Sequence, residues 1–396
     1  METQYKLVSK KILEKKKINV DYRFKLVYAI AMISVIADHL FGKGSIELNI
    51  QGWFNYNTYH MPLFMFSAGY FFKSRNINHT SEYIYKKFKK LIFPIYTYNF
   101  FYGLYVQVLK KLGFRSVYIK PFSFRIIFIE PLGGGGFQYI KPSWFSSSLF
   151  FVEVYNILKR KLTSILRIEF HESIYLIIDF IISYNSISLS NRGFNKIRIY
   201  MHILRFLHLN IYYEFGIFFS KYLENIIKSI KSDIFFTIIF LLKLLFHLYY
   251  SKVPHFFYGL CIYYNYPPIT VITISILGIF FWIRLSEILE PILGKNYYVN
   301  IIADNTFSIM VNHFLAFEIV KTTFAFISKY SNYCKDFHFN LYYSLSVYYI
   351  YIPNNVLQSG IIYFLSGLFI PIMIQKNIDI VKKKFFKIII SNNKQK

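Results

Sequence analysis

Apolar stretches long enough to cross a membrane as helices recur along the whole of this 396-residue chain. A helix rises about 1.5 Å per residue, so roughly 20 apolar residues are needed to cross the bilayer core. The pattern therefore predicts an all-α fold, a polytopic integral membrane protein with about ten transmembrane helices. The expected ranges are 22–41, 53–72, 91–109, 144–158, 171–187, 200–220, 233–250, 268–284, 305–325 and 356–374.

Composition and charge support this interpretation. Apolar residues make up 55% of the chain, and its mean hydropathy is +0.35. The net charge of +26 raises the possibility of nucleic-acid binding, but the basic residues lie between apolar runs rather than on one soluble face. With a cytoplasmic N-terminus, the segments on the cytoplasmic side hold about 30 of the 46 Lys and Arg residues. This bias predicts that both termini are cytoplasmic and argues against nucleic acid as a partner.

The chain is expected to form one integral domain. A basic cytoplasmic arm, 1–21, precedes the transmembrane domain, 22–375, and a basic cytoplasmic tail, 376–396, follows it. The stretch 110–143 is rich in Gly and Pro, so we expect an irregular outer loop, either a connector or a lid. Two cysteines in the whole chain argue against a disulfide framework and against a thiolate metal site.

Three of the histidines in or beside the apolar runs are candidate site residues. His39 ends the first run behind Asp38, His60 begins the second, and His313 lies within the ninth. Polar groups at such depths are costly, so each is a functional-site hypothesis. The structural alternatives are a hydrated cap for His39, an interfacial position for His60, and a neutral, hydrogen-bonded histidine for His313. Asp38 points about 100° away from His39 on a helix, so we expect it to contact another helix.

Glu153 and Glu214 are among the carboxylates that fall within predicted spans. Glu153 lies in the fourth span and Glu214 in the sixth, where a charge must be paired or neutralised. Arg205 and Lys243 are possible partners because they too lie within spans. We expect structural ion pairs at these positions.

Five segments together resemble one family. They are YAIAMISVIADH (28–39), YHMPLFMFSAGYFFK (59–73), KKFKKLIFPIY (86–96), PSWFSSSLFFVE (142–153) and NTFSIMVNHFLAF (305–317). Their order and spacing resemble the multispan acyltransferase type 3 family, especially its sugar O-acetylase branch. In that family the first helix ends with a histidine, a basic segment leads into the third span, and a Trp-Phe pair opens the fourth.

The resemblance implies transfer of an acyl group, acetyl above all, from acyl-CoA to a hydroxyl of a cell-surface polysaccharide or lipid-linked sugar. It implies His39 as the general base, since a histidine pKa lies near neutrality, and Lys25, Tyr28, His60 and His313 as substrate-binding residues. Acyl-CoA is then the donor substrate, no metal is needed, and the lipid bilayer and the sugar acceptor are the partners. The implied location is the cell membrane of a bacterium. The alternatives are an exporter of polysaccharide or lipid-linked sugar, and an inactive relative.

One position departs from the family pattern. Members typically carry Arg or Lys eleven residues before the first-helix histidine, and Tyr28 stands there in this chain. Tyr28 and His39 are expected on one helix face about 16 Å apart, and Lys25 is only about 40° away from that face. Lys25 either supplies the displaced cation or anchors the start of the helix.

Three further features have two interpretations each. The basic run 86–90 either attracts the phosphates of acyl-CoA or only sets the topology. The small residues 67–69 are expected to pack the second helix closely against the first. Trp144 is expected to be an interfacial anchor rather than a ligand contact.

The predicted topology is testable with reporter fusions. Reporters inserted near Arg75 and fused after Lys396 should both report the cytoplasm, because each follows an even number of crossings. A reporter near Gly134 should report the opposite side. The same side for Arg75 and Gly134 would show that the predicted number of spans between them is wrong.

Overall fold

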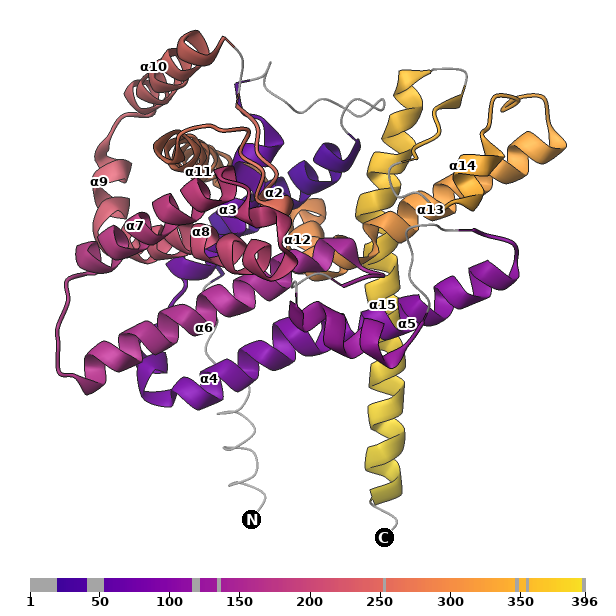
Figure 1. Ribbon diagram of the computed structural model, residues 1–396, viewed down its shortest axis with the longest axis horizontal. Coiled ribbons are helices and arrows are strands. Elements are labelled where there is room, and N and C mark those ends of the chain that lie inside the picture. Colours follow the sequence, from indigo (N-terminus) through magenta and orange to yellow (C-terminus); the bar gives the residue numbers. More distant parts are fainter. Residues whose placement is uncertain are drawn as a thin grey trace.

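The computed structural model describes residues 20–40, 53–115, 122–133, 137–251, 254–345, 349–353 and 356–393. Its regular structure is helical, with no strand among these residues (Figure 1). Residues 134–136, and so Gly134, lie outside the described ranges.

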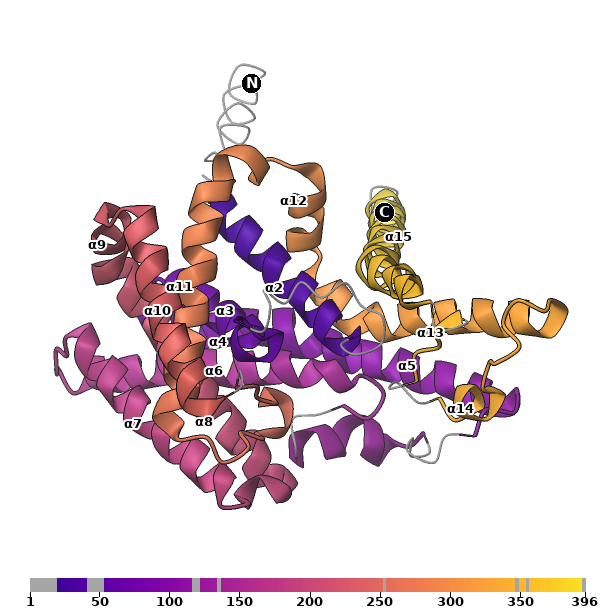
Figure 2. The ribbon, with the colours of Figure 1, turned by 90° about the horizontal axis from the view of Figure 1, so that it is seen from above.

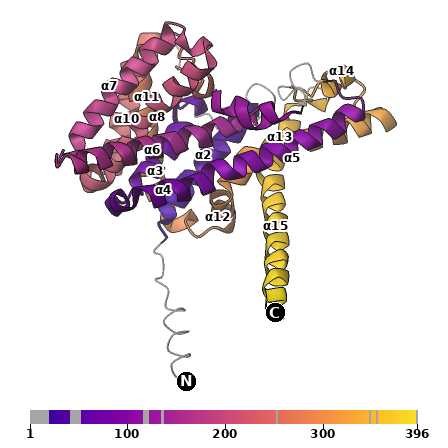
Figure 3. The same ribbon diagram turned by 60° about the horizontal axis from the view of Figure 1, so that its bottom comes forward.

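A helix is found at each of the ten predicted positions, so the expected all-helical fold is confirmed. The ten helices are α2 (Tyr22–Leu40), α3 (Tyr56–Tyr70), α5 (Phe93–Lys111), α6 (Trp144–Ile165), α7 (Glu172–Asn191), α8 (Arg198–Phe218), α10 (Ser232–Tyr250), α11 (Pro268–Leu293), α13 (Thr306–Tyr330) and α15 (Gly360–Asn393). Shorter helices join them: α4 (Thr80–Lys87), α9 (Glu224–Ser229), α12 (Tyr297–Asp304) and α14 (Phe339–Tyr343). The helix α15 continues through most of the predicted tail and projects away from the body (Figures 1 and 3).

Five helices are long and apolar enough to cross a membrane, namely α7, α10, α11, α13 and residues Gly360–Lys384 of α15. The helix α3 has only 15 residues. The helices α2, α6 and α8 contain buried charges, which lower their mean hydropathy. The structure is therefore consistent with a membrane protein, and the count of ten spans stays a prediction.

The helices α2 and α3 form an antiparallel hairpin. Phe24 contacts Tyr70 with ring centroids 4.3 Å apart, and the Ser34 and Tyr59 hydroxyls lie 3.0 Å apart further along the pair. The C-terminal end of α2 therefore lies beside the N-terminal end of α3. Figure 2 shows α2 next to α11 and α12, so this first helix is enclosed by later parts of the chain.

Glycines bring α3 and α8 into close backbone contact. A Cβ atom built on Gly69 would lie 1.9 Å from the carbonyl oxygen of Tyr213, and one built on Gly216 would lie 2.1 Å from that of Phe66. The predicted close packing at residues 67–69 is thus found, but Gly69 packs against α8 and not against the first helix. Only glycine fits at these two positions.

Buried ion pairs hold α6 to α7 and α8. The Arg160 guanidinium lies 2.7 Å from Glu172 and also pairs with Glu214. The Lys159 ammonium lies 2.5 Å from Asp179 and 3.2 Å from Glu214. Glu214 is therefore paired as expected, but neither Arg205 nor Lys243 is its partner, because the packing of α6 brings two nearer cations to it.

A second charged cluster fixes the start of α2. Arg23 donates to Glu224 at 2.8 Å and to Glu287 at 2.9 Å, and it also pairs with Asp21 at 3.0 Å. These bonds join α2 to α9 and α11. Breaking a buried pair by removing one partner leaves an uncompensated charge, so such pairs define which helices can be neighbours.

The glycine contact gives a stability prediction. Gly69→Ala should destabilise the protein by about 1–3 kcal/mol, because the added methyl group forces α3 and α8 apart. The measurement is thermal unfolding of the purified protein in detergent. Ala68→Ser is the matched control, since Ala68 is half-buried and lines a cavity. Equal midpoints for the two variants would contradict the close contact.

Candidate active site

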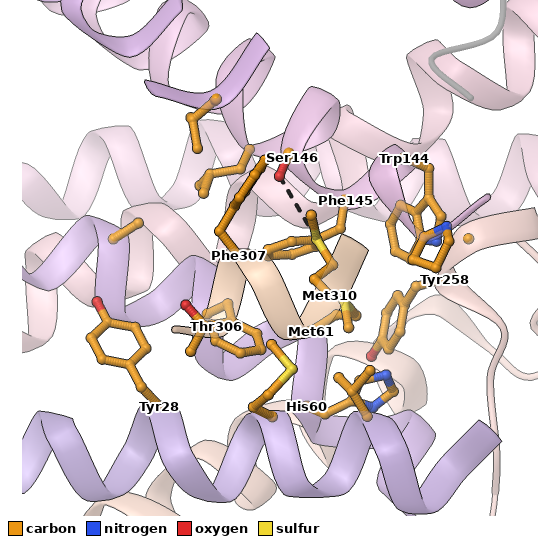
Figure 4. A pocket seen from close by; sticks show the side chains of 18 of the residues that line it. Tyr28, His60, Met61, Trp144, Phe145, Ser146, Tyr258, Thr306, Phe307 and Met310 are labelled. Carbon is orange, nitrogen blue, oxygen red and sulfur yellow. Dashed lines mark hydrogen bonds between the residues drawn. The ribbon is translucent and has the colours of Figure 1, made fainter. Parts of the chain in front are cut away.

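A cavity of about 1940 Å³ lies among the helices and contains most of the residues singled out from the sequence. Its wall includes Tyr28, His39 and His60, together with residues of α6, α8, α13 and the segment 254–264. Figure 4 shows Tyr28 and His60 facing the space from different sides, with Met61, Phe145 and Met310 between them. The cavity is therefore the candidate active site.

The cavity extends along the α2–α3 hairpin. Tyr28 and His39 both line it and are eleven residues apart on one helix, which corresponds to about 16 Å. The expectation that these two residues share a helix face is confirmed. We call the end near His39 and His60 the histidine end. The other end, near Lys73 and Lys87, is the lysine end.

At the histidine end, His39 and His313 lie face to face. Their ring centroids are 5.0 Å apart with an angle of 22° between the planes, and the Phe314 ring lies 4.9 Å from His39. His313 is fully buried, and its Nδ1 lies 2.9 Å from the Ile309 carbonyl oxygen. A carbonyl only accepts, so Nδ1 carries the proton and Nε2 is the basic atom. That Nε2 has no hydrogen-bond partner among the described residues.

His60 is buried in the wall of the same end. Its Nδ1 donates to the Tyr56 carbonyl oxygen one turn earlier, which leaves Nε2 as the acceptor atom. Near this ring in Figure 4, the Tyr258 hydroxyl donates to the Thr58 carbonyl oxygen at 3.3 Å and lies 2.6 Å from the Ser275 hydroxyl. Burial raises the pKa of that hydroxyl well above its usual range, so Tyr258 is a neutral donor. His60 is therefore a cavity residue rather than an interfacial one.

Asp38 contacts another helix, as expected. The Asn57 side chain at the start of α3 hydrogen-bonds to its carboxyl group, and both residues line the cavity. Asp38, in the last turn of α2, therefore lies beside the N-terminal start of α3. It helps to hold the two helices that carry His39 and His60.

The structure places Lys25 outside the cavity wall. Its ammonium group pairs with Asp304 at the end of α12, and Asp304 does line the cavity. Tyr28 lines the cavity itself and stacks on Phe64 with ring centroids 6.0 Å apart. Lys25 thus neutralises a carboxylate of the cavity wall instead of presenting its own charge there.

The lysine end carries several cations. They are Lys73, Lys86, Lys87 and Lys90. Lys87 pairs with Glu153 of α6, which is thus paired as expected, though with neither Arg205 nor Lys243. A π-helical turn, Phe88–Ile92, lies between α4 and α5 just before Pro94. Pro94 has no backbone N–H, so one hydrogen bond of a regular α-helix is absent beside this wider turn. Three lysines of the basic run, Lys86, Lys87 and Lys90, therefore line the cavity, and both interpretations of the run stay predictions.

Between the two ends the wall is apolar. Met61, Phe64, Phe145 and Met310 line this middle part, and the Ser146 hydroxyl lies 3.7 Å from the Met310 sulfur (Figure 4). Such a surface accommodates an acyl chain or the thin arm of a cofactor, while the charged groups remain at the two ends.

Sequence reasoning did not assign a site role to Trp144, Arg205 or Tyr258. All three line the histidine end, so Trp144 is not merely an interfacial anchor. Arg205 within an apolar run was the available signal, because an intramembrane charge marks a functional site by default. Tyr258 gave no signal in a chain with 37 tyrosines. The described residues contain no group of three or more His, Cys, Asp or Glu side chains placed to hold a metal ion.

Comparison with known proteins adds no relative. No protein-family model, no characterised protein and no solved structure matches this chain significantly. The acyltransferase resemblance therefore rests on the five sequence segments alone.

The Lys25–Asp304 pair gives a kinetic prediction for the acyl transfer that the resemblance implies. Lys25→Gln should raise the KM for acyl-CoA roughly 10-fold, because it leaves the Asp304 carboxylate uncompensated beside an anionic donor. The double variant Lys25→Gln, Asp304→Asn should restore the KM, since it removes both charges. A lower kcat without rescue would instead indicate direct contact of Lys25 with the donor. Unchanged kinetics would mean that Lys25 only anchors the helix.

Proposed function

We propose that the protein is a membrane-bound O-acyltransferase. It moves an acyl group, acetyl in the simplest case, from acyl-CoA to a hydroxyl of a cell-surface polysaccharide or lipid-linked sugar. The observation that carries the proposal is one cavity with a cluster of lysines at one end and histidines at the other. The five segments that resemble the acyltransferase type 3 family support it.

The donor would enter from the lysine end. Lys73, Lys86 and Lys90 provide positive charge for the phosphates of acyl-CoA. The apolar middle part then accommodates the pantetheine arm and directs the thioester toward the histidine end. With both termini cytoplasmic, this arrangement places the lysine end toward the cytoplasm, where acyl-CoA is made.

His39 would act as the general base. A ring nitrogen of His39 takes the proton of the sugar hydroxyl while its oxygen forms a bond to the thioester carbon. The tetrahedral intermediate then collapses, the carbon–sulfur bond breaks, and the proton passes to the departing sulfur. The imidazolium that forms in between lies against the faces of His313 and Phe314, and an aromatic face stabilises a cation.

Export of a sugar or polysaccharide is the second candidate. It is favoured by the size of the cavity, about 1940 Å³, which exceeds the 300–1,000 Å³ that is usual for small-molecule sites. An exporter needs no general base. An inactive relative is the third candidate, motivated by Tyr28 at the family's cationic position.

Histidine variants test the proposal. His39→Gln should lower acyl transfer from radiolabelled acetyl-CoA by at least about 100-fold, because general-base catalysis contributes that much. His338→Gln, an exposed residue outside the cavity, is the matched control. His313→Gln should have a smaller effect, since His313 supports the His39 ring.

Two outcomes separate the alternatives. If His39→Gln is fully active while His313→Gln is inactive, the base is wrongly assigned. If the wild-type protein transfers no acyl group but its deletion abolishes appearance of the glycan at the cell surface, the exporter is correct.

A further inference from the structure

Arg205 lies at the histidine end in an unusual environment for a buried cation. Only 2% of its surface is exposed, and it lines the cavity. Its Nη2 donates to the Gly259 carbonyl oxygen, and its guanidinium carbon lies 4.9 Å from the centre of the Trp144 ring. Its Nε and Nη1 atoms have no hydrogen-bond partner among the described residues. A guanidinium always carries its charge, so these donors need an acceptor.

The other buried arginines show what this protein does with such groups. Arg23, Arg160 and Arg284 each lie within 3.1 Å of at least one carboxylate oxygen. Within the described ranges, Arg205 is the one buried arginine without a carboxylate partner. The other buried arginines of the described part of the fold have a carboxylate partner, so the lack of one is specific to the buried arginine that lines the cavity.

The neighbouring wall is also cationic. Arg198, about two helix turns earlier on α8, and Lys141 both line the cavity. Arg198 lies 3.7 Å from Glu130, a contact too long for a strong bond. Burial lowers the pKa of the Lys141 ammonium.

We propose that this cluster, Arg205 with Arg198 and Lys141, is an anion subsite for the sugar acceptor. The inference rests on the proposed acyltransferase function and narrows its substrate class to sugars that carry an oxyanion. Either a carboxylate, as in a uronic acid, or a phosphate can accept hydrogen bonds from the unpartnered Nε–H and Nη1–H groups of Arg205. The anion fixes the sugar at the histidine end, so that a hydroxyl lies near His39.

The Trp144 ring provides a direct readout of binding. The chain has three tryptophans, so a variant with Trp53→Phe and Trp282→Phe reports Trp144 fluorescence alone. Purified in detergent, this protein is titrated with glucose, glucuronate and glucose 1-phosphate. An anion that binds Arg205 alters the field beside the indole, and at least one anionic sugar should bind ten-fold or more tightly than glucose. Whichever of glucuronate and glucose 1-phosphate binds more tightly shows whether the subsite prefers a carboxylate or a phosphate.

Matched arginine variants make the test specific. Arg205→Gln should abolish the preference for anionic sugars. Arg284→Gln should keep it, because Arg284 is also buried and also donates to a main-chain carbonyl, yet it lies outside the cavity wall. Arg205→Lys keeps the charge and should retain part of the preference if the Gln variant does not fold.

Equal affinities for glucose and both anionic sugars in the parent protein would overturn the proposal, whether or not any variant folds. A preference that survives Arg205→Gln would also overturn it. Because binding is measured without acyl-CoA, failure of acyl transfer leaves this result intact. Conversely, efficient transfer to neutral glycans with no anion preference would refute the subsite and leave the acyltransferase proposal standing.

Discussion

A charge inside an apolar helical bundle must be paired with an opposite charge or face a polar space, and this constraint organises the structure. Arg160 and Lys159 meet three carboxylates on α7 and α8, and Arg23 joins α2 to α9 and α11. In each cluster the charged groups are paired with one another within the wall of the bundle. They hold the helices together, and none of them is an unpaired charge that could serve in catalysis.

Two buried polar groups near the histidine end are of a different kind. Arg205, which lines the cavity, has no carboxylate partner within the described part of the chain, and the Nε2 of His313, which is buried against His39, has no hydrogen-bond partner there. Leaving such buried groups without a partner costs free energy, so they indicate a bound ligand that supplies the missing hydrogen bonds or the opposite charge. Under the proposed function, the lysine end would bind the anionic donor and the histidine end the acceptor, with the apolar middle part between them.

The sequence predicted the helices well because hydrophobic periodicity is local. All ten expected helices are found, and the helical repeat correctly placed Tyr28 and His39 on one face. The ends of helices were predicted less well. The last span was expected to end at residue 374, but α15 continues to Asn393.

Partners could not be predicted from the sequence, because they depend on which helices pack together. Glu214 was expected near Arg205 or Lys243 but pairs with Arg160. The stacking of His39 on His313 joins residues far apart in the chain, and no local pattern encodes it. The close fit of Gly69 on α8, rather than on α2, has the same origin.

The central claim is that one cavity holds the donor at the lysine end and presents its acyl group at the histidine end. An experimental structure with a non-hydrolysable acyl-CoA analogue tests this claim most directly. The account predicts that the phosphates lie against Lys86 and Lys90, and that the acyl carbon lies within reach of His39. Density for the analogue outside the cavity, or with its phosphates beside His39, would contradict the account.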